Sequence, residues 1–257
     1  MIPYLFNIGP FYCNCYGLAI ILGVWAFVHT IARNQRFKSI ISTNELLDLI
    51  GLTTLVAVTG SRILYIILHP SEFDSWADYV TIWQGGLSVL GGILATIAII
   101  PWYLRARKIA ILPLMDMAAV HVPLLHSIAR LGCFCAGCCC GAVTSVAWAI
   151  TYCHPDSSAP LGIPLHPAQL YSSFSLLGIY ILMRYVLQPR LIKPGQLASC
   201  YLILTGIERA INELFRAEYA PHYFNFLSSN QTISLALIAV GIIFFVISSY
   251  NRSHEPV

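Results

Sequence analysis

Long apolar stretches dominate the pattern of hydrophobic and polar positions along the chain. A membrane-spanning helix needs about 20 mostly apolar residues, and seven stretches approach that length. They cover residues 16–33, 46–68, 84–104, 113–133, 167–187, 196–216 and 230–249. Short polar segments separate them, and Pro113, Pro123 and two histidines interrupt the fourth. The pattern predicts an all-α polytopic membrane protein with seven transmembrane helices.

Composition supports this class. The chain is 58% hydrophobic and 10% charged, whereas a soluble domain carries about 25% charged residues. Its formal net charge of +3 gives no basis for binding nucleic acid. Met1 to Cys15 lacks a basic segment and contains Pro3 and Pro10, so we expect no cleavable signal peptide.

The distribution of basic residues predicts the topology. Ten of the fourteen fall on one side of the membrane if the spans alternate, and the positive-inside rule places that side in the cytoplasm. The amino terminus is then outside and the carboxyl terminus inside. The acidic segment 69–81 and the long segment at about 141–166 lie outside, the latter as a small head. We therefore expect a single seven-span membrane domain, residues 1–257. The ten basic residues are Arg33, Arg36, Lys38, Arg105, Arg107, Lys108, Arg184, Arg190, Lys193 and Arg252.

The other four basic residues lie within, or at the outer end of, a predicted span. They are Arg62, Arg130, Arg209 and Arg216. An arginine at the bilayer centre costs about 2.5–3.5 kcal/mol, so such residues usually face a polar interior, unless they reach the headgroups by snorkelling. Both interpretations stay open for Arg216. The other three fall in the outward halves of their spans and favour a shared site for a phosphate, which guanidinium groups bind well. The expected ligand is a phospholipid headgroup.

The sixth predicted span has an unusual density of polar residues, including Glu208, Arg209, Asn212, Glu213 and Arg216. Helical spacing predicts that Glu213 pairs with Arg209 and with Arg216. The alternative is a self-contained ladder of ion pairs without a ligand.

Two further segments carry small or polar residues beside a span. The glycine pairs 85–86 and 91–92 predict a face for close helix packing, which leaves Trp83, Gln84 and Ser88 unexplained. At the start of the fifth span, His166, Gln169 and Tyr171 predict a polar rim, although His166 alone is typical of a surface residue.

Five of the nine cysteines follow Arg130 closely: Cys133, Cys135, Cys138, Cys139 and Cys140. Cys135 and Cys138 have metal-ligand spacing, but a structural zinc site needs four ligands, so we expect no metal. Three alternatives stay open. They are a disulfide with Cys153, Cys13 or Cys15, a thiolate nucleophile at Cys133 or Cys138 favoured by Arg130, and simple packing.

Several motifs occur in a fixed order against these spans. They are Ile2-Pro3, Ile8-Gly9-Pro10, Tyr16-Gly17-Leu18, Gly60 with Arg62 and Tyr65, Trp83 to Ser88 with Gly91-Gly92, Arg130 to Gly141, His166 to Tyr171, Gly206 with Arg209, Glu213 to Arg216, and Gln231 with Ser234. In this order the chain resembles the prolipoprotein diacylglyceryl transferases, seven-span enzymes of the bacterial cytoplasmic (inner) membrane.

The resemblance implies transfer of the diacylglyceryl group of phosphatidylglycerol to the lipobox cysteine thiol of a prolipoprotein, without a cofactor. A thioether forms and glycerol phosphate is released. Arg130 and Arg209 would hold the phosphodiester and stabilise the leaving phosphate, and Glu213 would orient Arg209. Cys133 is the fourth expected catalytic residue. Substrate-binding roles are implied for Arg130, Tyr16, Arg62, Cys138, Gly141, His166, Gln169, Tyr171 and Arg216.

The chain departs from the family pattern at four positions. Cys133 and Cys138 stand where the family usually has asparagine and glutamate, Leu90 where it has histidine, and Thr205 where it has tyrosine. Two function classes follow. One is a transferase with an altered proton relay, and the other is a relative that keeps the lipid pocket for thiol redox chemistry or lipid binding.

Overall fold

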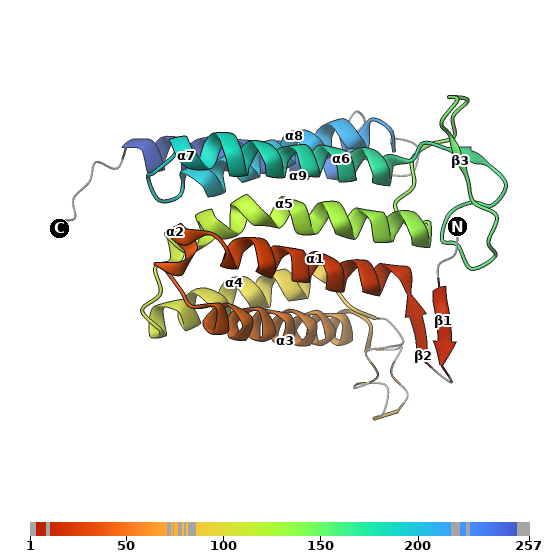
Figure 1. Ribbon diagram of the computed structural model, residues 1–257. Helices are drawn as coiled ribbons and strands as arrows, with labels where there is room; N and C mark the ends of the chain where they lie inside the picture. The colour runs from red at the N-terminus through yellow and green to blue at the C-terminus, as the bar shows by residue number, and fades with distance from the viewer. Residues whose placement is uncertain are drawn as a thin grey trace. The chain divides into compact units, whose positions relative to one another are not determined.

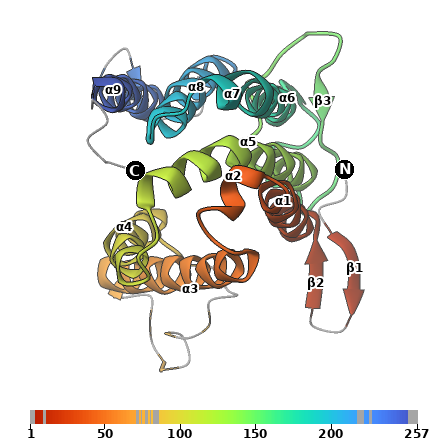
Figure 2. The same cartoon turned by 60° about the vertical axis from the view of Figure 1, so that its left-hand side comes forward.

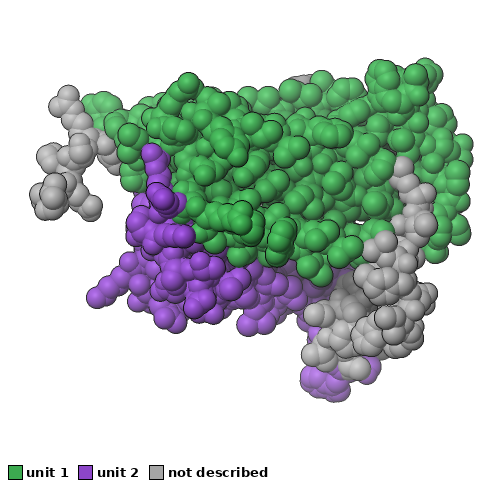
Figure 3. Space-filling view, in the orientation of Figure 1, with its two compact units in different colours: residues 1–34, 115–257 green, residues 35–114 purple. Residues whose placement is uncertain are grey.

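The protein is mostly helical in a computed structural model (Figure 1). The structure describes residues 4–8, 11–70, 73, 75–76, 79, 81, 86–216, 222–224 and 227–250. The chain divides into two compact units, residues 1–34 with 115–257 and residues 35–114 (Figure 3). The single membrane domain therefore stays a prediction. Residues that entered the predictions but lie outside the described ones are Ile2, Pro3, Gly9, Pro10, Trp83, Gln84, Gly85, Arg252 and the acidic residues of segment 69–81, which are Glu72, Asp74 and Asp78.

Within its described residues, the first unit contains five long helical segments and three two-stranded antiparallel sheets. Its elements are β1 (Tyr4–Ile8), β2 (Phe11–Asn14), α1 (Cys15–Ala32), nearly all of α5 (Ile111–Ala136), β3 (Ile150–Thr151), β4 (Pro164–Leu165), α6 (Ala168–Ile181), the π-helix η3 (Leu182–Leu187), α7 (Gln188–Arg190), α8 (Gln196–Glu213), β5 (His222–Phe224), β6 (Leu227–Ser228) and α9 (Ser229–Tyr250).

The head predicted at about 141–166 contains β3 and β4, which pair in antiparallel fashion with Ile150 opposite Leu165. Its small core consists of Tyr152, Ala159 and Leu165, all buried. A segment of this length holds its shape because these apolar side chains are removed from water.

The second unit is built on two antiparallel helices. It contains α2 (Gln35–Lys38), α3 (Thr43–Leu68) and α4 (Val89–Ala106). A capping box starts α3, in which Ser42 and Glu45 satisfy each other's backbone N–H groups. Gly91 and Gly92 of α4 lie against the backbone of α3, where an added Cβ at Gly92 would sit 3.0 Å from the carbonyl oxygen of Ala57. The structure thus shows the close packing that this glycine pair predicts.

Seven helical segments of 18 residues or more occur among the described residues. Five are long and apolar enough to cross a membrane: α1, α3, α5, α6 through α7, and residues 230–250 of α9. The predicted count of seven is not confirmed, because the described apolar part of α4 is short and α8 is too polar. Only 17% of the α1 span is buried within the protein, so its apolar side chains face outwards, as a lipid environment requires.

Helix α8 packs along α9 and also contacts α6 (Figures 1 and 2). Two glycines allow the α8–α9 approach. A Cβ on Gly206 would lie 3.0 Å from the carbonyl oxygen of Ser234, and one on Gly241 would lie 3.1 Å from the backbone nitrogen of Ile203. Helices without bulky side chains at the contact can approach in this way, as is common in membranes.

A buried carboxylate joins α5 to the beginning of α8. Asp116 of α5 accepts hydrogen bonds from the backbone N–H groups of Gly195, at 2.7 Å, and Ala198, at 2.8 Å. These N–H groups have no partner within the helix, and the positive end of the helix dipole favours an anion there. The contact holds α8 in register with α5.

Replacing Asp116 should therefore destabilise the first unit. Asp116→Ala leaves two buried N–H groups unpaired, and each costs about 1–3 kcal/mol. Asp116→Asn keeps one acceptor oxygen and should lie between the alanine variant and wild type in unfolding midpoint, measured by helix content in detergent. Equal midpoints for all three proteins would contradict the proposed anchor.

Candidate phosphate-binding pocket

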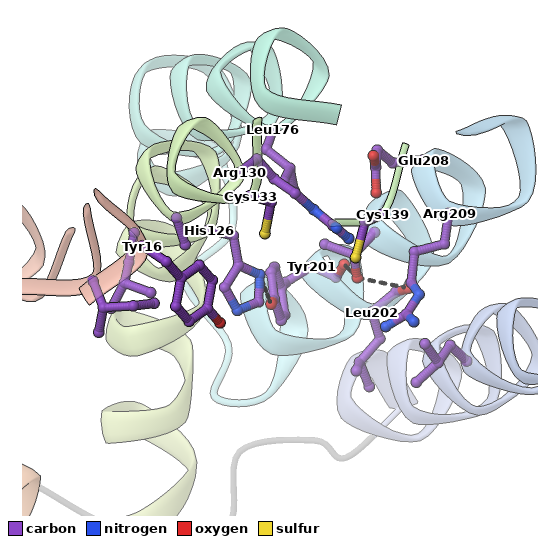
Figure 4. Close-up of a pocket in the computed structure, with 15 residues that line it drawn as sticks. Tyr16, His126, Arg130, Cys133, Cys139, Leu176, Tyr201, Leu202, Glu208 and Arg209 are labelled. Atoms are coloured by element: carbon purple, nitrogen blue, oxygen red, sulfur yellow. Dashed lines mark hydrogen bonds between the residues drawn. The ribbon is translucent and has the colours of Figure 1, made fainter. Parts of the chain in front are cut away.

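The first unit contains a pocket of about 580 Å³ (Figure 4). Helices α1, α5, α6, α8 and α9 contribute to its wall, together with Cys139 from the turn after α5. Much of the wall is apolar, with side chains such as Leu125, Leu176 and Leu237. Polar side chains gather on α5 and α8. A cavity of this kind suits a molecule with a charged group and apolar chains.

Arg130 and Arg209 line this pocket from α5 and α8. Within the part of the chain that the structure describes, neither guanidinium has a hydrogen bond or an ion pair. Two arginines without protein partners repel each other and favour an anion between them. Their planar donor groups match a phosphate better than an ammonium would.

Glu208 is a pocket residue to which the sequence prediction gave no role. Its carboxylate accepts a 2.6 Å hydrogen bond from Ser172 of α6 and lies in the electrostatic field of both pocket arginines. His126 and Tyr201 were also missed, and their side chains approach to 3.4 Å between Nδ1 and the hydroxyl oxygen. Helical spacing is the signal that finds them, because His126 precedes Arg130 by four residues. Thr205 and Tyr201 precede Arg209 by four and eight.

Tyr16 lines the pocket from α1. The contact between α1 and α5 brings it there, since a Cβ on Gly132 would lie 3.1 Å from the Cα of Tyr16. Gly23 makes a similar approach to Leu125 further along the same pair of helices. Tyr16 is therefore held beside Arg130 by backbone packing.

Arg62 belongs to the second unit, where it holds the connection between α3 and α4. Its guanidinium donates to the carbonyl oxygens of Gly86, at 2.9 Å, and Tyr79, at 3.4 Å, and lies over the ring of Phe73. Gly86 has φ of +71° and no room for a Cβ beside Arg62. Convergence of Arg62 with the pocket arginines stays a prediction.

Glu213 does not form the ion pairs predicted from its spacing. In the described residues it has no ion pair with Arg209 or Arg216. Its buried carboxylate instead accepts hydrogen bonds from Ser228 and Asn230, each at 3.1 Å. These partners lie at the beginning of α9, where the helix dipole also attracts an anion. Arg216, half-buried after α8, acts electrostatically on Cys139 and Cys140.

Three cysteines form a cluster at the end of α5. The Sγ atoms of Cys133, Cys138 and Cys139 all lie within 4.8 Å of one another, and Cys133 and Cys139 also line the pocket. Thiol hydrogen bonds from Cys133 and Cys138, and then the charges of Arg216 and Arg130, lower the pKa of the Cys139 thiol. The hydrogen bonds of Cys138 to Cys133 and Cys139 raise its own pKa. Within the cluster, the surroundings thus favour loss of the proton from Cys139 over loss from Cys138.

The disulfides considered for this region are not formed among the eight cysteines whose side chains are described. Cys15 is half-buried, and Cys153 is free and exposed. The side chain of Cys13 lies outside the description.

Gly141 marks a crossing of three chain segments, the turn after the cysteines, the residues before α6 and the end of α8. Its N–H donates to the carbonyl oxygen of His166 at 3.0 Å, and the next residue, Ala142, donates to Phe215 at 2.7 Å. A Cβ at Gly141 would lie 2.8 Å from both of those carbonyl oxygens. Only glycine fits this crossing.

The predicted rim residues support the turn and do not line the pocket. Gln169 is buried and donates to the carbonyl oxygen of Cys138 at 2.8 Å and to the Tyr152 hydroxyl at 3.4 Å. The Tyr171 hydroxyl accepts from Trp148 at 2.6 Å and lies 3.2 Å from His166 Nδ1.

Comparison with known proteins places the chain in a family. A model of the family "Prolipoprotein diacylglyceryl transferase" matches residues 3–247. The chain belongs to that family. Curated relatives named phosphatidylglycerol–prolipoprotein diacylglyceryl transferase include one from Rhodospirillum rubrum, 31% identical over 96% of this chain and 92% of the relative. One from Vibrio cholerae is 32% identical over 97% of this chain and 92% of the relative. One from Clostridium tetani is 28% identical over 98% of this chain and 100% of the relative.

The shape of the head, at about residues 141–166, should depend on Gly141. Gly141→Ala forces a methyl group against two backbone oxygens and should cost about 1–3 kcal/mol, as overpacking does. We expect faster proteolysis of segment 141–166. The control is Gly178→Ala in α6, where an added Cβ meets nothing within 4 Å. Equal proteolysis rates of the two variants would contradict the claim that the backbone packing at Gly141 requires glycine.

Proposed function

We propose that the protein transfers the diacylglyceryl group of phosphatidylglycerol to the lipobox cysteine of a prolipoprotein. The observation that carries this proposal is the pair of arginines without protein partners, Arg130 and Arg209, in a pocket with an otherwise largely apolar wall. The arginines suit the phosphate, and the apolar wall suits acyl chains. The family match and the names of the relatives support the same reaction. They give no support to the alternative of thiol redox chemistry or lipid binding alone.

In the proposed reaction the acceptor sulfur attacks the glyceryl carbon that carries the phosphate oxygen. A carbon–sulfur bond forms as the carbon–oxygen bond breaks, and the bonding electrons move to that oxygen. The thiol proton ends on the released glycerol phosphate, so no oxidant or cofactor is consumed. Arg130 and Arg209 stabilise the charge that develops on the departing phosphate, an electrostatic contribution that is often the largest in catalysis.

Six of the other expected site residues either line the pocket or position its residues in this proposal. Tyr16 lines the pocket and contacts the bound lipid. Gly141, His166, Gln169 and Tyr171 hold the turn that carries Cys138 and Cys139, as their hydrogen bonds support. Glu213 acts by fixing the end of α8 to the start of α9, through Ser228 and Asn230. It is a positioning residue for Arg209.

We further infer that all seven long helices cross the membrane, with the amino terminus outside and the carboxyl terminus in the cytoplasm. One contact supports the prediction that the basic segments lie on the same side of the membrane. Lys193, between α7 and α8, donates to the carbonyl oxygen of Ser249 at the end of α9, at 2.6 Å. The connection before α8 and the end of α9 therefore lie together in the first unit. Polar residues of α8 face the pocket, which accounts for the low apolarity of a spanning helix.

The reaction is tested with purified protein, phosphatidylglycerol vesicles and a lipobox peptide. The lipidated peptide is detected by its mass, and glycerol phosphate is measured in parallel. Arg130→Ala and Arg209→Ala should each lower kcat/KM by about 10²–10³-fold, as the loss of one transition-state donor does. Arg130→Lys keeps the charge but loses the planar guanidinium group, so its kcat/KM should lie between those of wild type and Arg130→Ala.

Arg190→Ala is the matched control, because Arg190 is exposed on α7, outside the pocket. It should retain the wild-type rate. If wild-type protein forms no thioether with any lipobox peptide, the proposed function is wrong. If Arg130→Ala and Arg190→Ala have equal rates, the assignment of the phosphate site is wrong.

A further inference from the structure

The three cysteines at the end of α5 have the separations of a metal-binding set. A tetrahedral Zn–S bond is about 2.3 Å, which places two sulfur ligands about 3.8 Å apart. The Sγ atoms of Cys133, Cys138 and Cys139 all lie within 4.8 Å of one another. Small side-chain adjustments bring them to ligand distances. The set differs from the Cys135 and Cys138 pair that the sequence spacing indicates.

The backbone between these residues is shaped to bring the sulfur atoms together. After Ala136 ends α5, Gly137 has φ of +76° and Cys139 has φ of +59°. Positive φ is easy for glycine but strained for cysteine, with a cost of about 1–3 kcal/mol, and such strain is concentrated at functional sites. The turn places the side chain of Cys139 beside those of Cys133 and Cys138.

The surroundings suit a negatively charged metal–thiolate group. Arg130 and Arg216 act electrostatically on Cys139, and Arg130 also acts on Cys133. Three thiolates and a divalent cation have a net charge of −1, which these arginines balance. The buried Gln169 amide holds the carbonyl oxygen of Cys138 at 2.8 Å. Outer hydrogen bonds of this kind fix the orientation of metal ligands.

We propose that Cys133, Cys138 and Cys139 bind a thiophilic divalent metal ion, with Zn²⁺ as the best match, and that its fourth position accepts the substrate thiolate. Three soft ligands favour such a metal, and a catalytic zinc site keeps one position for water or substrate. Cys133 and Cys139 line the pocket that contains Arg130 and Arg209, so the fourth position is assigned to the pocket side. The substrate half of this proposal rests on the transferase function proposed above.

The metal ion adds one feature to the reaction. The acceptor thiol would pass its proton to water as its sulfur joins the metal, and the bound thiolate would then attack the glyceryl carbon. The carbon–oxygen bond breaks, its electrons move to the phosphate oxygen, and the released glycerol phosphate takes up one proton. The oxidation states of the metal and the sulfur stay the same throughout.

Metal binding is tested directly on the full-length protein, reduced and held in lipid nanodiscs. After exposure to Zn²⁺ and desalting, the wild type should retain about one ion per chain, since the cluster offers one site. Single Cys→Ser variants at positions 133, 138 and 139 should lose it. Cys153→Ser should keep it, because Cys153 is exposed and lies outside the cluster. Wild type without stoichiometric zinc, or cluster variants with wild-type zinc, would overturn the site.

A second measurement needs no variant, so misfolding cannot imitate the result. Zn²⁺ should protect the three cluster thiols of wild-type protein from iodoacetamide and leave Cys153 reactive, as mapped by peptide mass. Equal alkylation with and without zinc would contradict the site. Co²⁺ offers the spectroscopic equivalent, because a bound cobalt–thiolate group has strong charge-transfer absorption that the cluster variants should lack.

The substrate half has its own test. A lipobox peptide should change the absorption of the cobalt protein, and the same peptide with serine for cysteine should not. No change with the cysteine peptide would overturn the fourth-ligand assignment. Full transferase rate in zinc-free protein would overturn the role of the metal and leave the transferase standing. Zinc bound without any transferase activity would overturn the proposed function and leave the metal site standing.

Discussion

The carboxylate of Asp116 sets the relation between the two helices that carry the phosphate site. It is bound to the backbone at the beginning of α8, and from this contact α5 and α8 both run towards the pocket. Arg130 follows Asp116 by fourteen residues, and Arg209 follows Ala198 by eleven. At 1.5 Å per residue these lengths are about 21 Å and 17 Å. A shift of one helix along the other at the anchor would therefore carry one guanidinium past its partner.

The charges of the pocket explain why the arginines tolerate their position. Glu208 partly offsets Arg130 and Arg209, but it also binds Ser172 and cannot neutralise both. The Asp116 and Glu213 carboxylates are committed to helix beginnings. Neither guanidinium therefore has an ion pair with a carboxylate among the described residues. Because solvation of ions is weak in an apolar environment, an anionic headgroup recovers most of the missing electrostatic stabilisation.

The two pocket arginines could be picked out from the sequence, whereas contacts made across turns could not. Arg130 and Arg209 were found because each is an unusual residue in an apolar helix, and helical spacing would have found His126, Thr205 and Tyr201. Two results could not be read from spacing. The cysteine cluster depends on positive φ at Gly137 and Cys139. The partners of Glu213 come from residues fifteen and seventeen positions later, across a turn. The predicted count of seven spans is not confirmed by length and apolarity, because the described apolar part of α4 is short and α8 has polar residues on the face that lines the pocket.

The backbone crossing at Gly141 has a consequence for how the site responds to motion. The turn that carries the cluster sulfurs and the end of the helix that carries Arg209 are joined through the hydrogen bond from Ala142 to Phe215. The turn and the end of α8 are therefore expected to move as one unit. A displacement of the head would move the turn with the cluster sulfurs and the end of α8 together. Such a displacement would preserve the separation between the thiol cluster and Arg209.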